Sequence, residues 1–83
     1  MNEDARQNRL GILYTRAGRT AEAKAAYERA AGLGSVPAMI NRGNMALGEN
    51  DYATAEKWYR QALQKQPENA SALRGLERIA GNR

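Results

Sequence analysis

The chain has 83 residues, which is enough for one small domain. It contains no cysteine and no histidine, which excludes disulfides, thiolate nucleophiles, histidine bases and Cys/His metal sites. The net charge of +4 favours acidic partners, whether an acidic peptide, a nucleic acid or a membrane surface.

The first predicted helix covers residues 4–17. Its apolar residues recur with the helical period and form one stripe: Leu10, Leu13, Tyr14 and Ala17. Gly18 follows as the left-handed residue that often ends a helix. We therefore expect this stripe to face the core.

The second predicted helix covers residues 20–31, with Thr20 as its candidate N-cap. One face of this helix carries Ala23, Tyr27 and Ala30. The small alanines allow a paired helix to approach closely, and the Tyr27 ring fills the space that remains. Gly32 and Gly34 then end the helix.

Three further helices are predicted in the second half of the chain. The third is capped by Ser35, has Pro37 in its first turn and runs to about Leu47. The fourth is capped by Asp51 and stops before Pro67. The fifth covers residues 70–80 behind an Asn69 cap. Its expected buried face comprises Leu73, Leu76, Ile79 and Ala80.

Trp58 stands next to Tyr59 in the fourth helix, about 100° further around the helix axis. We expect Tyr59 in the core and Trp58 half-exposed on the outer side. Two interpretations of Trp58 stay open: packing over a helix junction, or an interface anchor, a role in which tryptophan is enriched.

The helix pairs repeat along the chain with an offset of 32 residues. Gly11, Ala23, Tyr27 and Ala30 are matched in register by Gly43, Ala55, Tyr59 and Ala62. Four matches over two helices indicate an internal repeat. From the third helix to the fifth, the pairs Met39–Leu73 and Ala46–Ala80 predict an offset of 34.

The motif residues resemble the tetratricopeptide repeat, whose pattern W-x2-L-G-x2-Y, A-x3-F, P spans about 34 residues. The first copy reads Leu10-Gly11-x2-Tyr14 and Ala23-x3-Tyr27; the second reads Asn41-Arg42-Gly43-Asn44, Ala55-x3-Tyr59 and Pro67. Arg42 stands where leucine is usual, and the stretch YERAAGLGSVPA also looks like Sel1-like repeats. The resemblance implies an all-α fold of antiparallel helix pairs, stacked as a short right-handed α-solenoid. It implies one domain, 1–83, with repeats at about 4–34 and 36–67 and a capping helix at about 69–81.

By the same resemblance, the chain is a protein–protein interaction module, an adaptor or scaffold that binds a peptide or protein segment in a concave groove. The groove-facing candidates are Asn8, Ile12, Ile40, Asn41, Asn44, Leu47, Arg74 and Arg78. Asparagine both donates and accepts hydrogen bonds to a peptide backbone, and arginine binds a carboxylate through two parallel bonds. The alternative interpretation is a solvated face whose surface ion pairs, such as one with Glu77 or Asp51, contribute about 0–1 kcal/mol.

Some family members bind the C-terminal carboxylate of chaperones with a clamp of Lys and Asn, then Asn, then Lys and Arg, on three successive groove helices. The matching positions here are Asn8 and Ile12, then Asn41, then Ser71 and Gly75. Only Asn41 has the clamp's residue type, so we do not expect chaperone C-termini as ligands.

Other functions are weighed against this one. A structural or homo-oligomerising unit is the first alternative, because two helix pairs and one further helix are close to the minimum for a stable array. Weak nucleic-acid binding through the basic surface comes third.

We expect no enzyme, cofactor or metal site, because the serines at helix starts have no histidine base and no phosphate loop is present. No apolar run nears the length of a membrane span, and the first residues lack the basic-then-apolar pattern of a signal peptide. These two features favour a cytoplasmic location without fixing the compartment.

Overall fold

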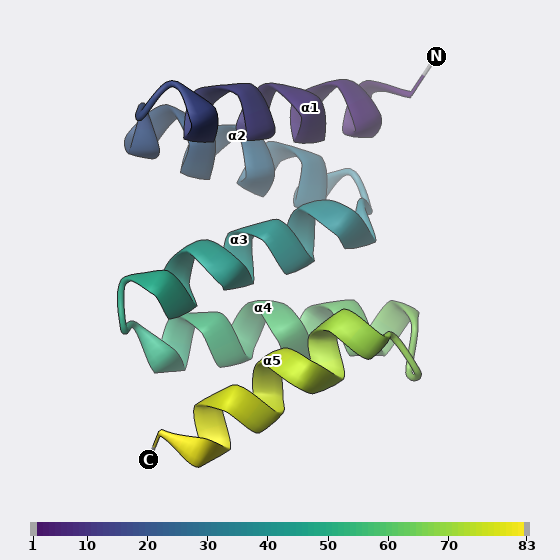
Figure 1. The fold of residues 1–83 in the computed structure, drawn as a ribbon. Coiled ribbons are helices and arrows are strands. Elements are labelled where there is room, and N and C mark those ends of the chain that lie inside the picture. Colours follow the sequence, from purple (N-terminus) through teal and green to yellow (C-terminus); the bar gives the residue numbers. More distant parts are fainter. Residues whose placement is uncertain (1, 83) are drawn as a thin grey trace.

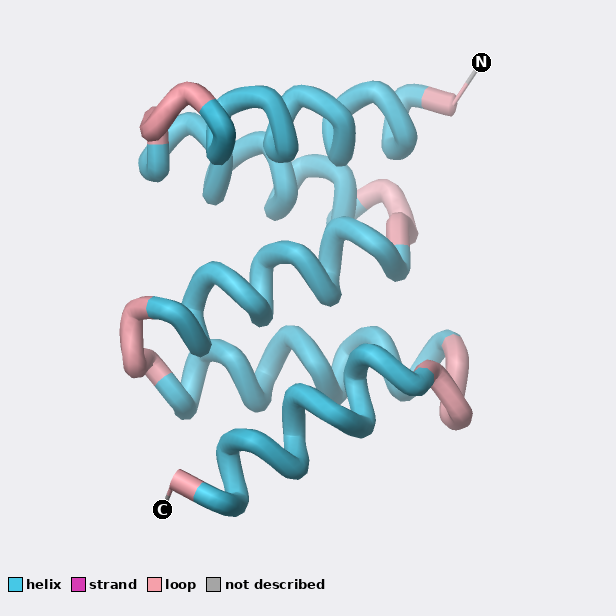
Figure 2. Tube along the Cα trace, viewed as in Figure 1, coloured by secondary structure: helices cyan, strands magenta, loops and turns pink. Residues whose placement is uncertain are grey.

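The computed structural model describes residues 2–82, which form five α-helices joined by short turns (Figure 1, Figure 2). The helices are α1 Glu3–Arg16, α2 Thr20–Gly32, α3 Val36–Gly48, α4 Tyr52–Lys65 and α5 Ala70–Gly81. Residues 2–82 contain no strand. The predicted all-α helical-repeat class is confirmed.

The helices form a stack that is two rows deep. Each helix packs against the next in the chain, and α3 also contacts α5. In Figure 1, α1, α3 and α5 form the nearer row and α2 and α4 the farther one. The principal extents of 36 × 27 × 15 Å fit such a flat stack. The nearer row therefore supplies one broad face, which we call the front face.

Local capping signals explain where most of the helices begin. The side chains of Ser35, Asp51 and Asn69 accept hydrogen bonds from the backbone N–H groups of Ala38, Thr54 and Ala72 at 3.2, 3.3 and 2.9 Å. These three predicted N-caps are confirmed. The prediction for Thr20 is wrong: α2 already includes it, and the N-cap is Arg19, whose side chain makes no capping bond.

Two tyrosine rings lie against glycines of neighbouring helices. Tyr59 of α4 has no exposed surface, and its ring packs between Gly43 of α3 and Gly75 of α5. A Cβ on Gly43 would stand 2.9 Å from the Tyr59 ring, and one on Gly75 would overlap it. Tyr27 of α2 fits against Gly11 of α1 in the same way. Each ring thus occupies the space of an absent side chain, which is why these helices approach so closely.

The buried face of α5 differs from the prediction. Leu73 is 44% exposed and Ala80 is exposed, whereas Ala72, Gly75 and Ile79 are buried. The contact between Gly75 and the Tyr59 ring sets the rotation of α5, so its inward face is centred on the glycine and Leu73 turns outward. The spacing of 32 residues from Gly43 therefore continues to Gly75, in place of the predicted 34.

The same reasoning corrects the predicted stripe of α1. Leu13 is 51% exposed and Ala17 is exposed, while Gly11 is buried and Ile12 packs partly against the core. Because Gly11 must face Tyr27, Leu13 lies about 200° further around the helix and points away.

Trp58 is buried rather than half-exposed, with 9% of its surface accessible. It belongs to the core cluster with Ala55, Tyr59 and Ala62 of the same helix. The inward face of α4 is therefore wider than predicted. Trp58 therefore packs in the core, and little of its surface is left to anchor an interface.

Arg42 is a charged residue of the core region, at the position where the repeat usually has leucine. Its side chain is 10% exposed, and its Nε donates to Oε2 of Glu28 at 2.8 Å. Its Nη1 is buried without a hydrogen-bond partner among the described atoms. The ion pair connects α2 to α3.

We predict that Gly75→Ala destabilises the fold. Overpacking of a tight contact costs about 1–3 kcal/mol, and the new methyl would meet the Tyr59 ring. Gly48→Ala is the matched control, because Gly48 also lies in a helix and a Cβ there would meet nothing within 4 Å.

Thermal unfolding followed by circular dichroism measures both variants. The melting temperature should fall for Gly75→Ala, by about 4–8 °C per kcal/mol lost, and should stay level or rise for Gly48→Ala. Equal melting temperatures in the two variants would contradict the proposed role of the Tyr59 ring.

Candidate binding surface

Three hollows follow one another across the front face. The first, between α1 and the start of α3, has a volume of about 340 Å³ and is lined by Asp4, Ala5, Asn8, Arg9, Ile12, Ser35 and Pro37. The central hollow, of about 280 Å³, is lined by Val36, Pro37, Ile40, Asn41, Gln66, Asn69 and Ser71. The α3/α5 hollow, of about 250 Å³, is lined by Asn44, Ser71, Arg74, Gly75 and Arg78. Pro37 lines both the first and the central hollow, and Ser71 lines both the central and the α3/α5 hollow, so the three hollows are neighbours in one row, which we call the track.

The track gathers seven of the eight residues proposed from the sequence. Asn8 and Ile12 line the first hollow, Ile40 and Asn41 the central one, and Asn44, Arg74 and Arg78 the α3/α5 hollow. Leu47 lines none of the three and is 8% exposed. Ile40, at 9% exposure, shows only an edge of its side chain. The accessible track is therefore more polar than the sequence suggested.

Sequence reasoning missed part of the central hollow. Gln66 and Asn69 come from the turn between α4 and α5, and Ser71 from the first turn of α5. In the sequence, these residues only mark the turn after the fourth helix and the start of the fifth helix. Only the packing of that turn against α3 brings them to the front face.

Asparagines connect α1 and α3 across the track. Nδ2 of Asn41 donates a hydrogen bond to Oδ1 of Asn8 at 3.0 Å. This bond uses one polar atom of each side chain. Nδ2 of Asn8 and Oδ1 of Asn41 therefore stay available, one as a donor and the other as an acceptor.

Tyr59 is buried beneath the front face and bonds to Asn44, a lining residue of the α3/α5 hollow. The Tyr59 hydroxyl donates to Oδ1 of Asn44 at 2.5 Å. Burial raises the pKa of the Tyr59 phenol above its ordinary value of 10.0, and the positive charge of Arg78 opposes this rise. The guanidinium of Arg78 thus lies within electrostatic reach of the phenol.

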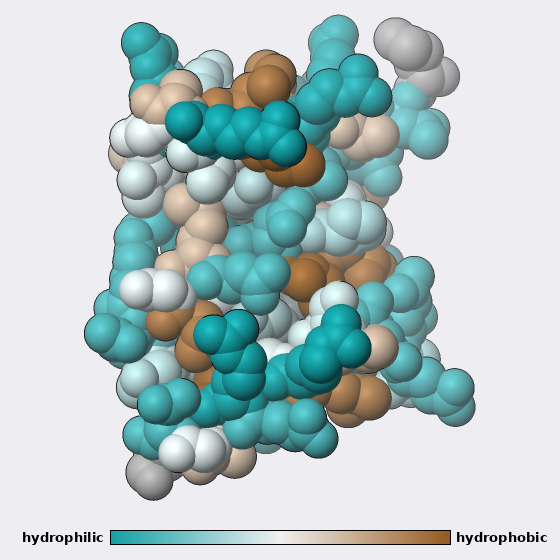
Figure 3. Space-filling model, viewed as in Figure 1, coloured by the Kyte–Doolittle hydropathy of each residue, from teal (hydrophilic) through white to brown (hydrophobic). Residues whose placement is uncertain are grey.

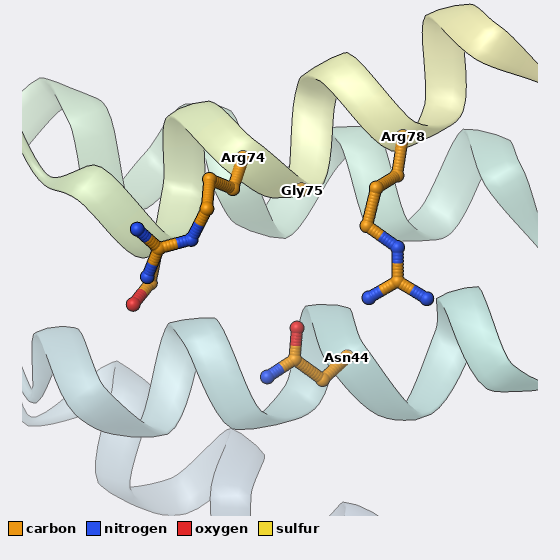
Figure 4. A pocket seen from close by; sticks show the side chains of 5 residues that line it. Asn44, Arg74, Gly75 and Arg78 are labelled. Atoms are coloured by element: carbon orange, nitrogen blue, oxygen red, sulfur yellow. The ribbon is translucent and has the colours of Figure 1, made fainter.

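Arg74 and Arg78 have no acidic partner within residues 2–82, as is also true of Arg9, Arg16 and Arg29. Four other arginines form ion pairs with glutamates: Arg6, Arg19, Arg42 and Arg60. Within residues 2–82 neither Arg74 nor Arg78 is paired, so the alternative of surface pairs with Glu77 or Asp51 is not observed. In Figure 4 the two side chains extend from either side of Gly75 toward α3, where Asn44 lies between them.

Figure 3 shows hydrophilic and hydrophobic side chains interspersed over the front face, with several hydrophilic side chains in the region of α5. The described residues include no group of three or more acidic side chains arranged to hold a metal ion. No helix between residues 2 and 82 is long and apolar enough to cross a membrane.

Stacked helix pairs with glycine–tyrosine contacts define a helical-repeat protein, and the comparisons name the family. Family models described as tetratricopeptide repeat match residues 6–33 and 36–69, together most of the chain. The chain belongs to the tetratricopeptide repeat family. Members of this family generally mediate protein–protein interaction or scaffolding and are generally not enzymes. No curated protein matches the chain, and the Sel1-like resemblance stays a prediction.

We predict that Arg78→Gln raises the pKa of Tyr59 further, because it removes the positive charge that opposes the effect of burial. The ring carbons of tyrosine, followed by NMR between pH 9 and 12 in the folded protein, report this ionisation, and Tyr59→Phe identifies the signal. Arg60→Gln is the control, since Arg60 pairs with Glu56. An unchanged Tyr59 titration in Arg78→Gln would place the guanidinium away from the phenol.

The sign of the linked stability follows from the raised pKa. A phenol whose pKa is higher in the folded state contributes stability that is complete below the unfolded pKa and is lost as pH rises through the folded pKa. The free energy of unfolding should therefore fall above about pH 10.

Proposed function

We propose that the chain binds a segment of another protein along the track of three hollows on the front face, as an adaptor or scaffold. The continuity of the track carries this proposal: neighbouring hollows share Pro37 and Ser71, so one elongated ligand could contact α1, α3 and α5 together. The family's general role in protein–protein interaction supports it.

The chemistry of the track suits a polypeptide backbone. Amide side chains line its first two thirds: Asn8, Asn41, Gln66 and Asn69. Asn69 already caps α5 and donates to Gln66, whereas Nδ2 of Asn8 and Oδ1 of Asn41 can bond to peptide C=O and N–H groups whatever the ligand's sequence. The 36 Å longest dimension of the molecule limits an extended ligand to roughly ten residues in contact.

Ser71→Tyr should abolish partner binding, because Ser71 is exposed and lies where two hollows meet. Ala53→Tyr is the matched control: it is also exposed and also the second residue of its helix, in the other row of the stack. Both variants and the wild type are used as baits in nuclease-treated lysate, and captured proteins are identified by mass spectrometry.

A protein captured by wild type and Ala53→Tyr but lost by Ser71→Tyr supports the groove. Equal capture by all three baits would move the binding face elsewhere. Circular dichroism and thermal unfolding must show that both variants stay folded.

The structural or homo-oligomerising alternative has its own observation. Leu13 and Leu73 are 51% and 44% exposed on α1 and α5, the terminal helices of the stack. Self-association through these ends would bury both leucines. Sedimentation at increasing concentration tests this alternative, and a strict monomer at high concentration would exclude it.

A further inference from the structure

We infer that copies of this chain stack head to tail, with α1 of one copy packed parallel against α5 of the next. Such stacking uses the two ends of the helix stack and leaves the track free, so it goes beyond the proposed function. It gives the self-association considered above one definite arrangement. Three observations support it: matching apolar stripes on α1 and α5, their position at opposite ends of the stack, and complementary unpaired charges beside them.

The two terminal helices carry the same apolar pattern, L-x2-L-x3-A. Its residues are Leu10, Leu13 and Ala17 in α1, and Leu73, Leu76 and Ala80 in α5. Residues at this spacing share one face of a helix, so each set forms a stripe. Leu13 and Leu73 are 51% and 44% exposed, both alanines are exposed, and the other two leucines are half-buried. Neither stripe is therefore fully covered by the rest of the chain that the structure describes.

The stripes face away from the body of the stack at its two ends. α1 and α5 are the first and last helices of the nearer row and run in the same direction (Figure 1). Gly11 and Gly75 face tyrosine rings of the core. Leu13 stands two residues after Gly11 and Leu73 two residues before Gly75, and two residues span about 200° around a helix. A second copy placed further along the stack therefore brings its α1 stripe against the α5 stripe of the first copy, with the two helices parallel.

Unpaired charges of opposite sign lie beside the two stripes. Arg9 immediately precedes the first leucine of the α1 stripe, and Glu77 immediately follows the second leucine of the α5 stripe. With the leucines at heptad positions a and d, Arg9 occupies g and Glu77 occupies e, the positions that form ion pairs between parallel helices. Both side chains are exposed, and neither has an ion pair within residues 2–82. The parallel contact thus places an arginine beside a glutamate.

Two-fold contacts between like ends lack this charge match. In an antiparallel pair of α5 helices, Glu77 lies on the same edge as Glu77 of the other copy, and in such a pair of α1 helices Arg9 meets Arg9. Like charges placed together disfavour a contact. The head-to-tail contact joins unlike ends and leaves one free α1 and one free α5 in every open oligomer. Association therefore continues beyond the dimer.

The first measurement is the oligomeric state of the full chain. Sedimentation equilibrium covers about 10 µM to about 1 mM, because a contact one helix wide is smaller than a standard stable interface and binds weakly. We expect the average mass to rise with concentration and to exceed that of a dimer. A mass that stays at the monomer, or that levels off at the dimer, would overturn the inference.

The sharpest variants each block one end of the stack. Leu13→Glu places a charge in the α1 stripe, Leu73→Glu places one in the α5 stripe, and both replace exposed residues. Leu33→Glu is the matched control, because Leu33 is 57% exposed in the turn between α2 and α3, outside both stripes. Circular dichroism and thermal unfolding check that all three variants are folded.

Alone, Leu13→Glu and Leu73→Glu should each stay monomeric at concentrations where the wild type and Leu33→Glu associate. Mixed in equal amounts, they should form a dimer and nothing larger, because each variant keeps the end that the other has lost. Association of either end variant by itself would indicate a two-fold contact and overturn the inference. A mixture that stays monomeric would overturn it too.

A charge exchange tests the parallel arrangement without changing the stripes. Arg9→Glu and Glu77→Arg, each alone, bring like charges together and should weaken association a few-fold. In an equal mixture, the changed α1 of one variant meets the changed α5 of the other, so association should return to wild-type strength. Glu68→Arg is the matched control, since Glu68 is exposed in the turn before α5 and has no ion pair within residues 2–82. Without recovery in the mixture, the parallel contact is wrong.

The stacking and the proposed function fail separately. Ser71→Tyr, which fills the track, should self-associate as the wild type does, and Leu13→Glu should capture the same partner as the wild type. Loss of self-association in Ser71→Tyr would place the contact between copies in the track and overturn head-to-tail stacking. Equal partner capture by wild type and Ser71→Tyr would refute the proposed function and leave the stacking intact.

Discussion

The ring of Tyr59 fills the space that Gly43 and Gly75 leave by having no side chains, and this contact joins α3, α4 and α5. A ring of fixed shape between two backbones leaves little freedom in how the helices rotate or how closely they approach. The rotation of α5 follows from it, and with that rotation Arg74 and Arg78 face the α3/α5 hollow while Leu73 turns outward. The tyrosine thus sets both the packing and the orientation of the proposed site.

The two ends of the same side chain perform different tasks. The apolar ring of Tyr59 is buried and holds the helices together, whereas its hydroxyl ends at Asn44, beside the surface. Aromatic residues with a polar tip commonly pack one end and hydrogen-bond with the other. The substitution Tyr59→Phe removes the hydroxyl and keeps the ring. It therefore separates the contribution of the hydroxyl to stability and binding from that of the ring.

The charges of the chain are arranged in two ways. Away from the α3/α5 hollow, four arginines pair with glutamates: Arg6, Arg19, Arg60 and the largely buried Arg42. In the hollow, Arg74 and Arg78 have no such partner among the described residues. Exposed ion pairs contribute only about 0–1 kcal/mol to stability, so little stability is lost by leaving these arginines unpaired.

The sequence by itself determined the five helices, three of their caps and the repeat, because periodicity, capping residues and glycine–tyrosine spacing act between residues close in the chain or at a constant offset. Only the tertiary structure decided the rotation of α1 and α5, the burial of Trp58 and the hollow that unites Asn44 with Arg74 and Arg78. Hydrophobicity alone suggested that Leu13 and Leu73 face inward. Gly11 and Gly75 instead take those faces, because close approach to a tyrosine ring requires the absence of a side chain, and that requirement exists only once distant helices meet.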